Sequence, residues 1–62
     1  MNRDQAIHTA ATHLNATITE LNTHGLTDTF AHHAQATLDA TTAAESHGAT
    51  VADIRAAAGR NT

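Results

Sequence analysis

The stretch HGATVADIRAAAGRNT, residues 47–62, decides the fold that we expect for this chain. Gly48 marks a helix end and a tight turn, because glycine readily adopts the backbone conformation that closes a helix. Thr50 and Asp53 then stand three positions apart, as in the capping box that begins a helix. Gly59 is expected to end this helix. The stretch therefore predicts a turn, one short capped helix and the opening of a second turn.

The first predicted helix covers about residues 3–24. Asn2 precedes it as a cap, with Gln5 three positions later as in a capping box. Apolar residues recur along this helix with the alternating three- and four-residue spacing of a narrow heptad stripe. They are Ile7, Ala11, Leu14, Ile18 and Leu21. The stripe suits an amphipathic core helix as well as a coiled coil, and either one requires a surface to pack against.

Another glycine separates this helix from the second predicted helix, which covers about residues 28–47. Gly25 is expected to end the first helix and Thr27 to cap the second. Leu26 occupies the position of a hydrophobic staple. Because only two or three residues connect the helices, they are expected to fold back on each other as an antiparallel hairpin.

The second helix has an inner face that is apolar early and polar late. Phe30 and Leu38 provide its large side chains, whereas Thr41 and Glu45 are expected to face inward near its end. Together these elements predict an all-α chain of one domain, residues 1–62. Within it, a helical hairpin over 3–47 precedes a short capped helix over 50–58.

Composition indicates how such a chain would become stable. Hydrophobic residues make up 40% of it, but most of these are alanines, which bury little area, and no cysteine is present. For chains this short, the gain from burial roughly equals the loss of conformational entropy. We therefore expect a homo-oligomer, most simply a dimer, or another protein as partner. The expected interface consists of Ile7, Ala11, Leu14, Ile18, Leu21, Phe30 and Leu38.

The charge balance argues against a free-standing nucleic-acid-binding protein. The net charge is −3, lysine is absent and only three arginines are present, whereas such proteins usually carry a basic face. No apolar run is long enough to span a membrane, so no membrane partner is expected. The absence of cysteine is compatible with the cytoplasm, which is the location that we expect.

Residues 48–61 resemble the helix-turn-helix DNA-binding regulators of bacteria, plasmids and phages. In that family a short helix ends at a small residue followed by glycine, and the recognition helix comes after the turn. The packing positions match Val51, Ile54 and Ala58, the turn glycine matches Gly59, and the cap of the recognition helix matches Asn61. Arg55 departs from the pattern, because the motif normally has a small residue there.

The resemblance implies a dimerisation or scaffold module of such a regulator, present without its DNA-reading helix. That helix supplies the base contacts in this family. DNA would then be a partner only if a recognition helix follows Thr62, and Arg55, Arg60 and Asn61 would be the candidate nucleic-acid contacts. The alternative is a stand-alone small helical interaction protein, an adaptor or antagonist, that does not bind DNA.

Nothing in the sequence points to catalysis or to a cofactor. It has no glycine-rich phosphate loop and no cysteine, and its one serine, Ser46, has no assigned base. Of the six histidines, His8 and His13 are five positions apart, which rotates them by about 140° from each other on a helix. We therefore expect no enzyme and no metal site within one chain, although histidines from two copies could share a metal.

Overall fold

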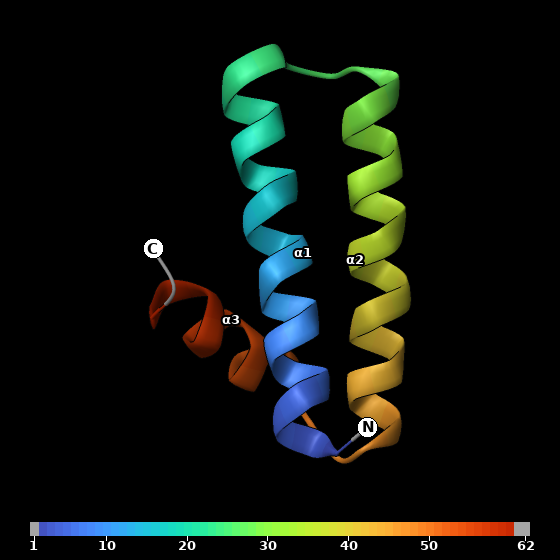
Figure 1. Cartoon of the computed structure of the whole chain (residues 1–62), viewed down its shortest axis with the longest axis vertical. Coiled ribbons are helices and arrows are strands. Elements are labelled where there is room, and N and C mark those ends of the chain that lie inside the picture. The colour runs from blue at the N-terminus through green and yellow to red at the C-terminus, as the bar shows by residue number, and fades with distance from the viewer. Residues whose placement is uncertain (1, 61–62) are drawn as a thin grey trace.

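The computed structural model describes residues 2–60, which form three helices and contain no strand. The helices are α1 (Arg3–His24), α2 (Asp28–Ser46) and α3 (Val51–Arg60). α1 and α2 lie side by side in opposite directions, and α3 packs beside the N-terminal half of α1 (Figure 1). The all-α prediction and the antiparallel hairpin are confirmed.

The expected N-terminal caps are present. The Gln5 backbone N–H donates to Oδ1 of Asn2 at 2.8 Å, and the Asn2 backbone N–H donates to Oε1 of Gln5 at 3.1 Å. At the start of α2, Oγ1 of Thr27 accepts from the Phe30 backbone N–H at 3.0 Å. These bonds satisfy N–H groups that have no partner within a helix's first turn.

The turn between α2 and α3 also follows the prediction. Gly48 has a φ of 89°, and Gly25 in the other connector has a φ of 76°, values that L side chains rarely adopt. Thr50 and Asp53 form a complete capping box: the Asp53 N–H donates to Thr50 Oγ1 at 3.1 Å, and the Thr50 N–H donates to Asp53 Oδ2 at 3.0 Å. The local sequence is therefore enough to predict both connectors, the one between α1 and α2 and the one between α2 and α3.

The expectation that Gly59 ends the third helix is wrong. α3 continues through Gly59 to Arg60, so it extends past the predicted range of 50–58. Gly59 does not have the positive φ found at Gly25 and Gly48. A glycine within a helix costs only about 1 kcal/mol relative to alanine, which the preceding alanine-rich turn can tolerate.

Two expectations about side-chain direction are also wrong. Leu26 makes no hydrophobic staple, since it is 83% exposed. A staple pairs this residue with the fourth residue of the helix, which here is Ala31, too short to reach it. Glu45 is exposed, because the preceding residue, Ala44, takes the inward position and is completely buried.

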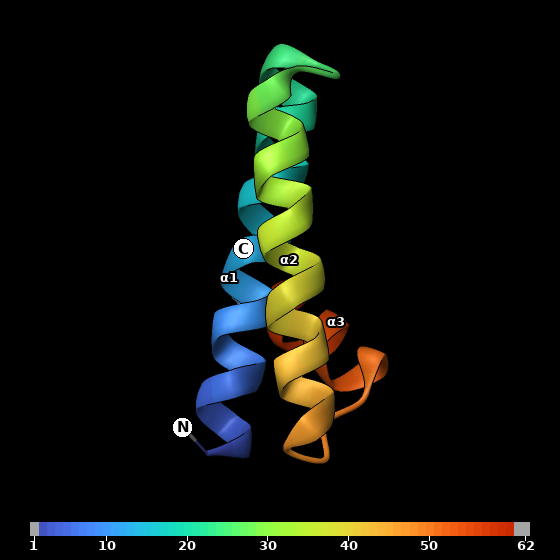
Figure 2. The same ribbon diagram turned by 90° about the vertical axis from the view of Figure 1, so that its right-hand side faces the viewer.

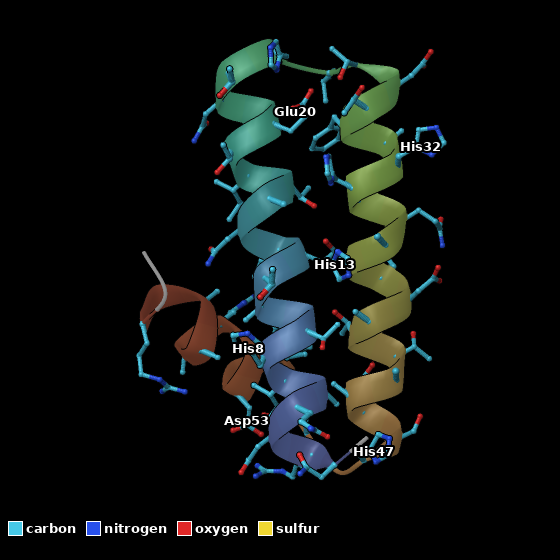
Figure 3. The ribbon with its side chains drawn as sticks, in the orientation of Figure 1. His8, His13, Glu20, His32, His47 and Asp53 are labelled. Carbon is cyan, nitrogen blue, oxygen red and sulfur yellow. The ribbon has the colours of Figure 1, made fainter. Side chains whose placement is uncertain are left out.

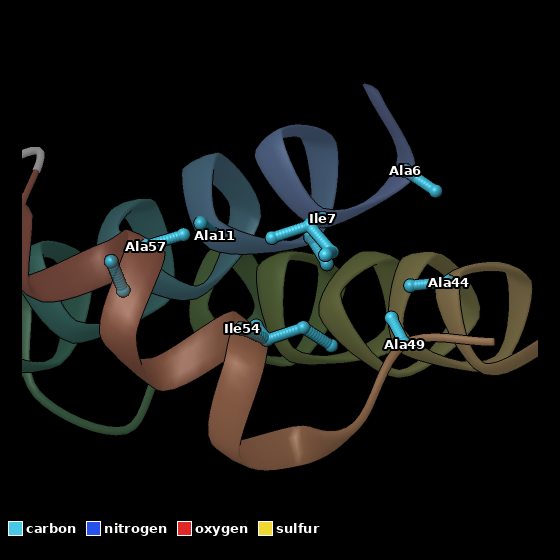
Figure 4. Packing of buried hydrophobic residues seen from close by; sticks show 9 residues of the cluster. Ala6, Ile7, Ala11, Ala44, Ala49, Ile54 and Ala57 are labelled. Atoms are coloured by element: carbon cyan, nitrogen blue, oxygen red, sulfur yellow. The ribbon is translucent and has the colours of Figure 1, made fainter. Parts of the chain in front are cut away.

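The core consists of seven alanines and two isoleucines and lies where the three helices meet (Figure 4). No large side chain among residues 2–60 is completely buried. Alanine is small and so permits a close approach of the helices that pack through it. The buried residues are Ala6, Ile7, Ala10, Ala11, Ala44, Ala49, Ile54, Ala57 and Ala58.

Polar contacts fix the register of the helices around this core. The hydroxyls of Thr17 in α1 and Thr37 in α2 hydrogen-bond at 2.9 Å. Nδ2 of Asn15 donates to the Ala58 carbonyl oxygen at 3.1 Å and so links α1 to the C-terminal half of α3. Within residues 2–60, no helix is both long and apolar enough to cross a membrane.

Candidate interaction surface

Apart from Ile7, the larger aliphatic side chains of the hairpin lie at or near its surface, while its buried positions hold mostly alanine. Ile18 is 47% exposed, Leu21 is 41% exposed and Leu38 is 62% exposed. Leu14 is only partly buried, at the edge of the core. Exposed single aliphatic residues are ordinary in proteins, whereas several gathered on one surface indicate an interaction site. These four residues share one face of the hairpin, as their positions on the two helices show.

Three of these residues, Leu14, Ile18 and Leu21, lie on α1 and continue the apolar stripe whose first part α3 covers. Ile7 and Ala11 are buried in the core shared with α3. Ile18 lies seven positions after Ala11, which brings it back to the same side of the helix two turns further on. Leu14 and Leu21 are related in the same way. The apolar stripe of α1 therefore runs past the end of α3 and is uncovered beyond it.

Leu38 lies on this same side of the hairpin. Thr17 and Thr37 point at each other across the helix pair, as their hydrogen bond shows. Each next residue is rotated by about 100° in the same sense along its own helix. Because the helices are antiparallel, these rotations turn Ile18 and Leu38 toward the same side. That side is also the one on which α3 packs, since Ala11, seven positions before Ile18, is buried in the core shared with α3.

We call this surface the distal face. It consists of Leu14, Ile18 and Leu21 from α1 and Ala34 and Leu38 from α2. Figure 2 shows α3 beside the lower part of the hairpin only, with the part near the α1–α2 connector uncovered. The distal face is thus an apolar strip between α3 and the tip of the hairpin.

Charged side chains of the same segments point elsewhere. Glu20 lies two positions after Ile18, which places it about 200° around α1. Its Oε1 is instead 3.2 Å from Nδ1 of His24, and Thr27 Oγ1 donates to it at 3.4 Å. Asp39 accepts a hydrogen bond from Gln35 at 3.1 Å on the outer side of α2. The distal face itself is therefore uncharged.

The structure divides the interface residues expected from sequence into two groups. Ile7 and Ala11 are buried within the chain, against α3, and so cannot contact a second chain while this fold is intact. Ile18, Leu21 and Leu38 are exposed. Leu14 and Phe30 are partly buried. The heptad spacing of the stripe does not distinguish packing within the chain from packing between chains.

The candidate nucleic-acid contacts do not form one surface. Arg55 and Arg60 are both exposed but five positions apart on α3, so they point in directions that differ by about 140°. Asn61 lies outside the described residues. The described part of the chain therefore does not place Arg55 and Arg60 side by side as a basic patch.

Arg60 instead lines a shallow cleft of about 390 Å³ between the start of α1 and α3. Arg3, His8, Asp4 and Asp53 line the same cleft. Nη2 of Arg3 is 3.0 Å from Oδ2 of Asp53, so the Arg3 charge is already paired within the chain. With two arginines facing two aspartates, the cleft has little net charge to attract an ionic ligand.

The histidines are spread along the hairpin. Figure 3 shows His47 near one end of α2, His32 toward the other, and His8 and His13 at different heights on α1. Within residues 2–60, no group of three or more histidine, aspartate or glutamate side chains is arranged to hold a metal ion.

Comparison with known proteins identifies no relative: no family model, no curated protein and no solved structure matches this chain. The distal face is therefore the feature of the molecule that bears on its function. Sequence reasoning missed one residue of importance to that surface, Asn15, which fixes the position of α3 and hence the edge of the distal face. An asparagine next to an apolar stripe carries no signal for such a contact.

Proposed function

We propose that this chain is a non-catalytic helical module for protein–protein interaction and that its distal face is the docking surface. The observation that carries this proposal is the exposure of Ile18, Leu21 and Leu38 on one uncharged side of a hairpin whose buried residues are mostly alanines. Burial of apolar area is the main driving force of most protein association. The chain leaves most of its large apolar side chains available for that purpose.

The hairpin is suited to present such a face. Both of its helices begin at hydrogen-bonded caps, and the Thr17–Thr37 bond crosses between them next to the exposed side chains. Sites built on helices hold their geometry better than sites on loops. An apolar helix face that docks on a partner is a common recognition mode.

The resemblance to helix-turn-helix regulators supports a narrower version, in which this module is the dimerisation scaffold of such a regulator. Gly59, which marked the turn of the motif, lies within α3. The side chains of Arg55 and Arg60 also point in different directions, so they do not form one DNA-binding surface. We therefore favour the more general interaction module, and DNA binding would depend on a recognition helix after Thr62.

Site-specific photocrosslinking tests the proposed docking surface. A photoreactive amino acid replaces Leu38 in the distal face or, as control, Ala43, which is also exposed on α2 but lies about 140° further around it. The variants are irradiated in the cells that express them. We expect a covalent protein adduct at position 38 and little at position 43. Equal adduct yields at both positions would contradict the proposal.

A further inference from the structure

We infer that the occupant of the distal face is a second copy of this chain, packed face to face with the hairpins antiparallel. The inference rests on the proposed function and names the partner. In this arrangement α1 packs on α1 of the partner and α2 on α2, which produces a four-helix bundle of two layers. The two copies of α3 lie at opposite ends of it.

The position of α3 decides the orientation. It projects from the same side of the hairpin as the distal face, next to the N-terminal half of α1 (Figure 2). If two copies met face to face with their hairpins parallel, each α3 would run into the same end of the partner's hairpin and hold the distal faces apart. In the antiparallel orientation, each α3 lies beyond the tip of the other hairpin. Only this orientation lets both distal faces make contact.

The dimensions of the uncovered strip fit this arrangement. The contact between Asn15 and Ala58 marks how far α3 reaches along α1. From Leu14 to His24, α1 rises by about 15 Å at 1.5 Å per residue. A second hairpin laid antiparallel over this length brings its tip next to the C-terminal half of α3. The tip carries Leu26, 83% exposed, which then has an apolar surface to contact.

Charge does not oppose a copy of the same chain as the partner at the distal face. Each chain has a net charge of −3, so two copies repel each other where charged surfaces meet. The distal face has no charged side chain, and Glu20 and Asp39 point away from it. An uncharged face is the surface on which like-charged copies meet with least repulsion. It also has no acidic side chain that could form an ion pair with a basic partner.

The small size of the chain favours association, because the chain buries few large side chains by itself. Its accessible surface is 4000 Å², and no large side chain in residues 2–60 is completely buried. A standard interface buries roughly 800 Å² per partner, which is about one fifth of this surface. Dimerisation would bury Ile18, Leu21 and Leu38 together and so add large apolar contacts to a core whose only large buried residues in the described part of the chain are Ile7 and Ile54.

Sedimentation of the purified chain tests the inference. We expect wild type to sediment as a dimer and Leu38→Glu to weaken dimerisation by on the order of a hundredfold or more, since an unpaired carboxylate would be buried. Leu38 is largely exposed in the single chain, so the helical content measured by circular dichroism should persist. Ala43→Glu is the matched control and should remain dimeric. A monomeric wild type, or a dimer that tolerates Leu38→Glu, would overturn the inference.

A cysteine pair tests the orientation independently. The antiparallel arrangement brings Ile18 close to Ile18 of the partner subunit, because this residue lies near the centre of the uncovered part of α1. The chain has no native cysteine, so Ile18→Cys provides a single reactive thiol. We expect a short bis-maleimide to link two Ile18→Cys chains efficiently but not two Thr23→Cys chains, whose thiol lies on another side of α1. Equal linking of both would contradict the orientation.

These outcomes separate the two proposals. A monomeric wild type together with an adduct of a different protein at position 38 in cells would reject self-association and retain the interaction module. Absence of an adduct at position 38 together with a dimer that tolerates Leu38→Glu would reject both.

Discussion

Arg3 in the first turn of α1 and Asp53 in the first turn of α3 form an ion pair of 3.0 Å, although they are fifty positions apart in the sequence. The same Oδ2 of Asp53 accepts the Thr50 backbone N–H at 3.0 Å and so completes the capping box of α3. One carboxylate thus begins α3 and also ties it to α1. Its charge state should affect how well α3 is held on the hairpin.

The first prediction concerns the acid stability of this arrangement. Hydrogen bonds to Thr50, and after them the Arg3 guanidinium, hold the pKa of the Asp53 carboxyl below its ordinary value of 3.8. A lowered pKa in the folded state gives a stabilisation that is complete above the unfolded value and is lost as pH falls through the folded value. The melting temperature should therefore decrease as the pH is lowered from about 4. In Asp53→Asn, the melting temperature should depend less on pH in this acidic range.

Arg3→Gln provides the control for this prediction, because it removes the ion pair and leaves the capping box intact. Its melting temperature should be closer to wild type at pH 7 than that of Asp53→Asn, since an exposed ion pair contributes little. If Asp53→Asn follows the wild-type profile below pH 4, the carboxylate does not hold α3 in place.

The second prediction concerns the alanine core. Ala44 is completely buried between the helices, whereas Ala43 next to it is exposed. Ala44→Leu should destabilise the chain by about 1–3 kcal/mol, because the larger side chain forces the closely packed helices apart. Ala43→Leu should change stability by less than about 0.5 kcal/mol. Urea denaturation followed by circular dichroism measures both, and similar values for the two variants would contradict the observed burial.

This pair also shows why the core was not predicted from sequence. The helix limits depended on local signals such as Asn2, Thr27 and Gly48, and the sequence predicted most of them. Ala43 and Ala44 have the same side chain, and only tertiary packing decides which one is buried. The stripe on α1 likewise predicted a packed face, but not that α3 would cover Ala11 and leave Ile18 exposed.

The third prediction compares two glycines that play different roles. Gly48 has a φ of 89°, and a Cβ added there would meet no atom within 4 Å, so Gly48→Ala costs only the strain of the left-handed backbone. That cost is about 1–2 kcal/mol. Gly59 lies within α3, where a Cβ would also meet nothing. Gly59→Ala should therefore stabilise the chain by about 0.5–1 kcal/mol.

Thermal unfolding of these two variants tests the corrected end of α3. Opposite shifts in melting temperature are expected. If Gly59→Ala destabilised the chain as Gly48→Ala does, Gly59 would have the positive φ of a helix terminator, and the turn expected from sequence would be restored.

The last prediction concerns the docking of α3 on the hairpin. Nδ2 of Asn15 donates to the Ala58 carbonyl oxygen at 3.1 Å, in the C-terminal half of α3. Asn15→Ala removes this donor and should cost about 1 kcal/mol, as is typical for one hydrogen bond. Because the contact joins α3 to α1, the loss should appear as faster amide hydrogen exchange in α3, with the α1–α2 hairpin little changed. Asn22→Ala, an exposed position on the same helix, is the control. Uniformly faster exchange in all three helices of Asn15→Ala would mean that α3 does not open separately from the hairpin.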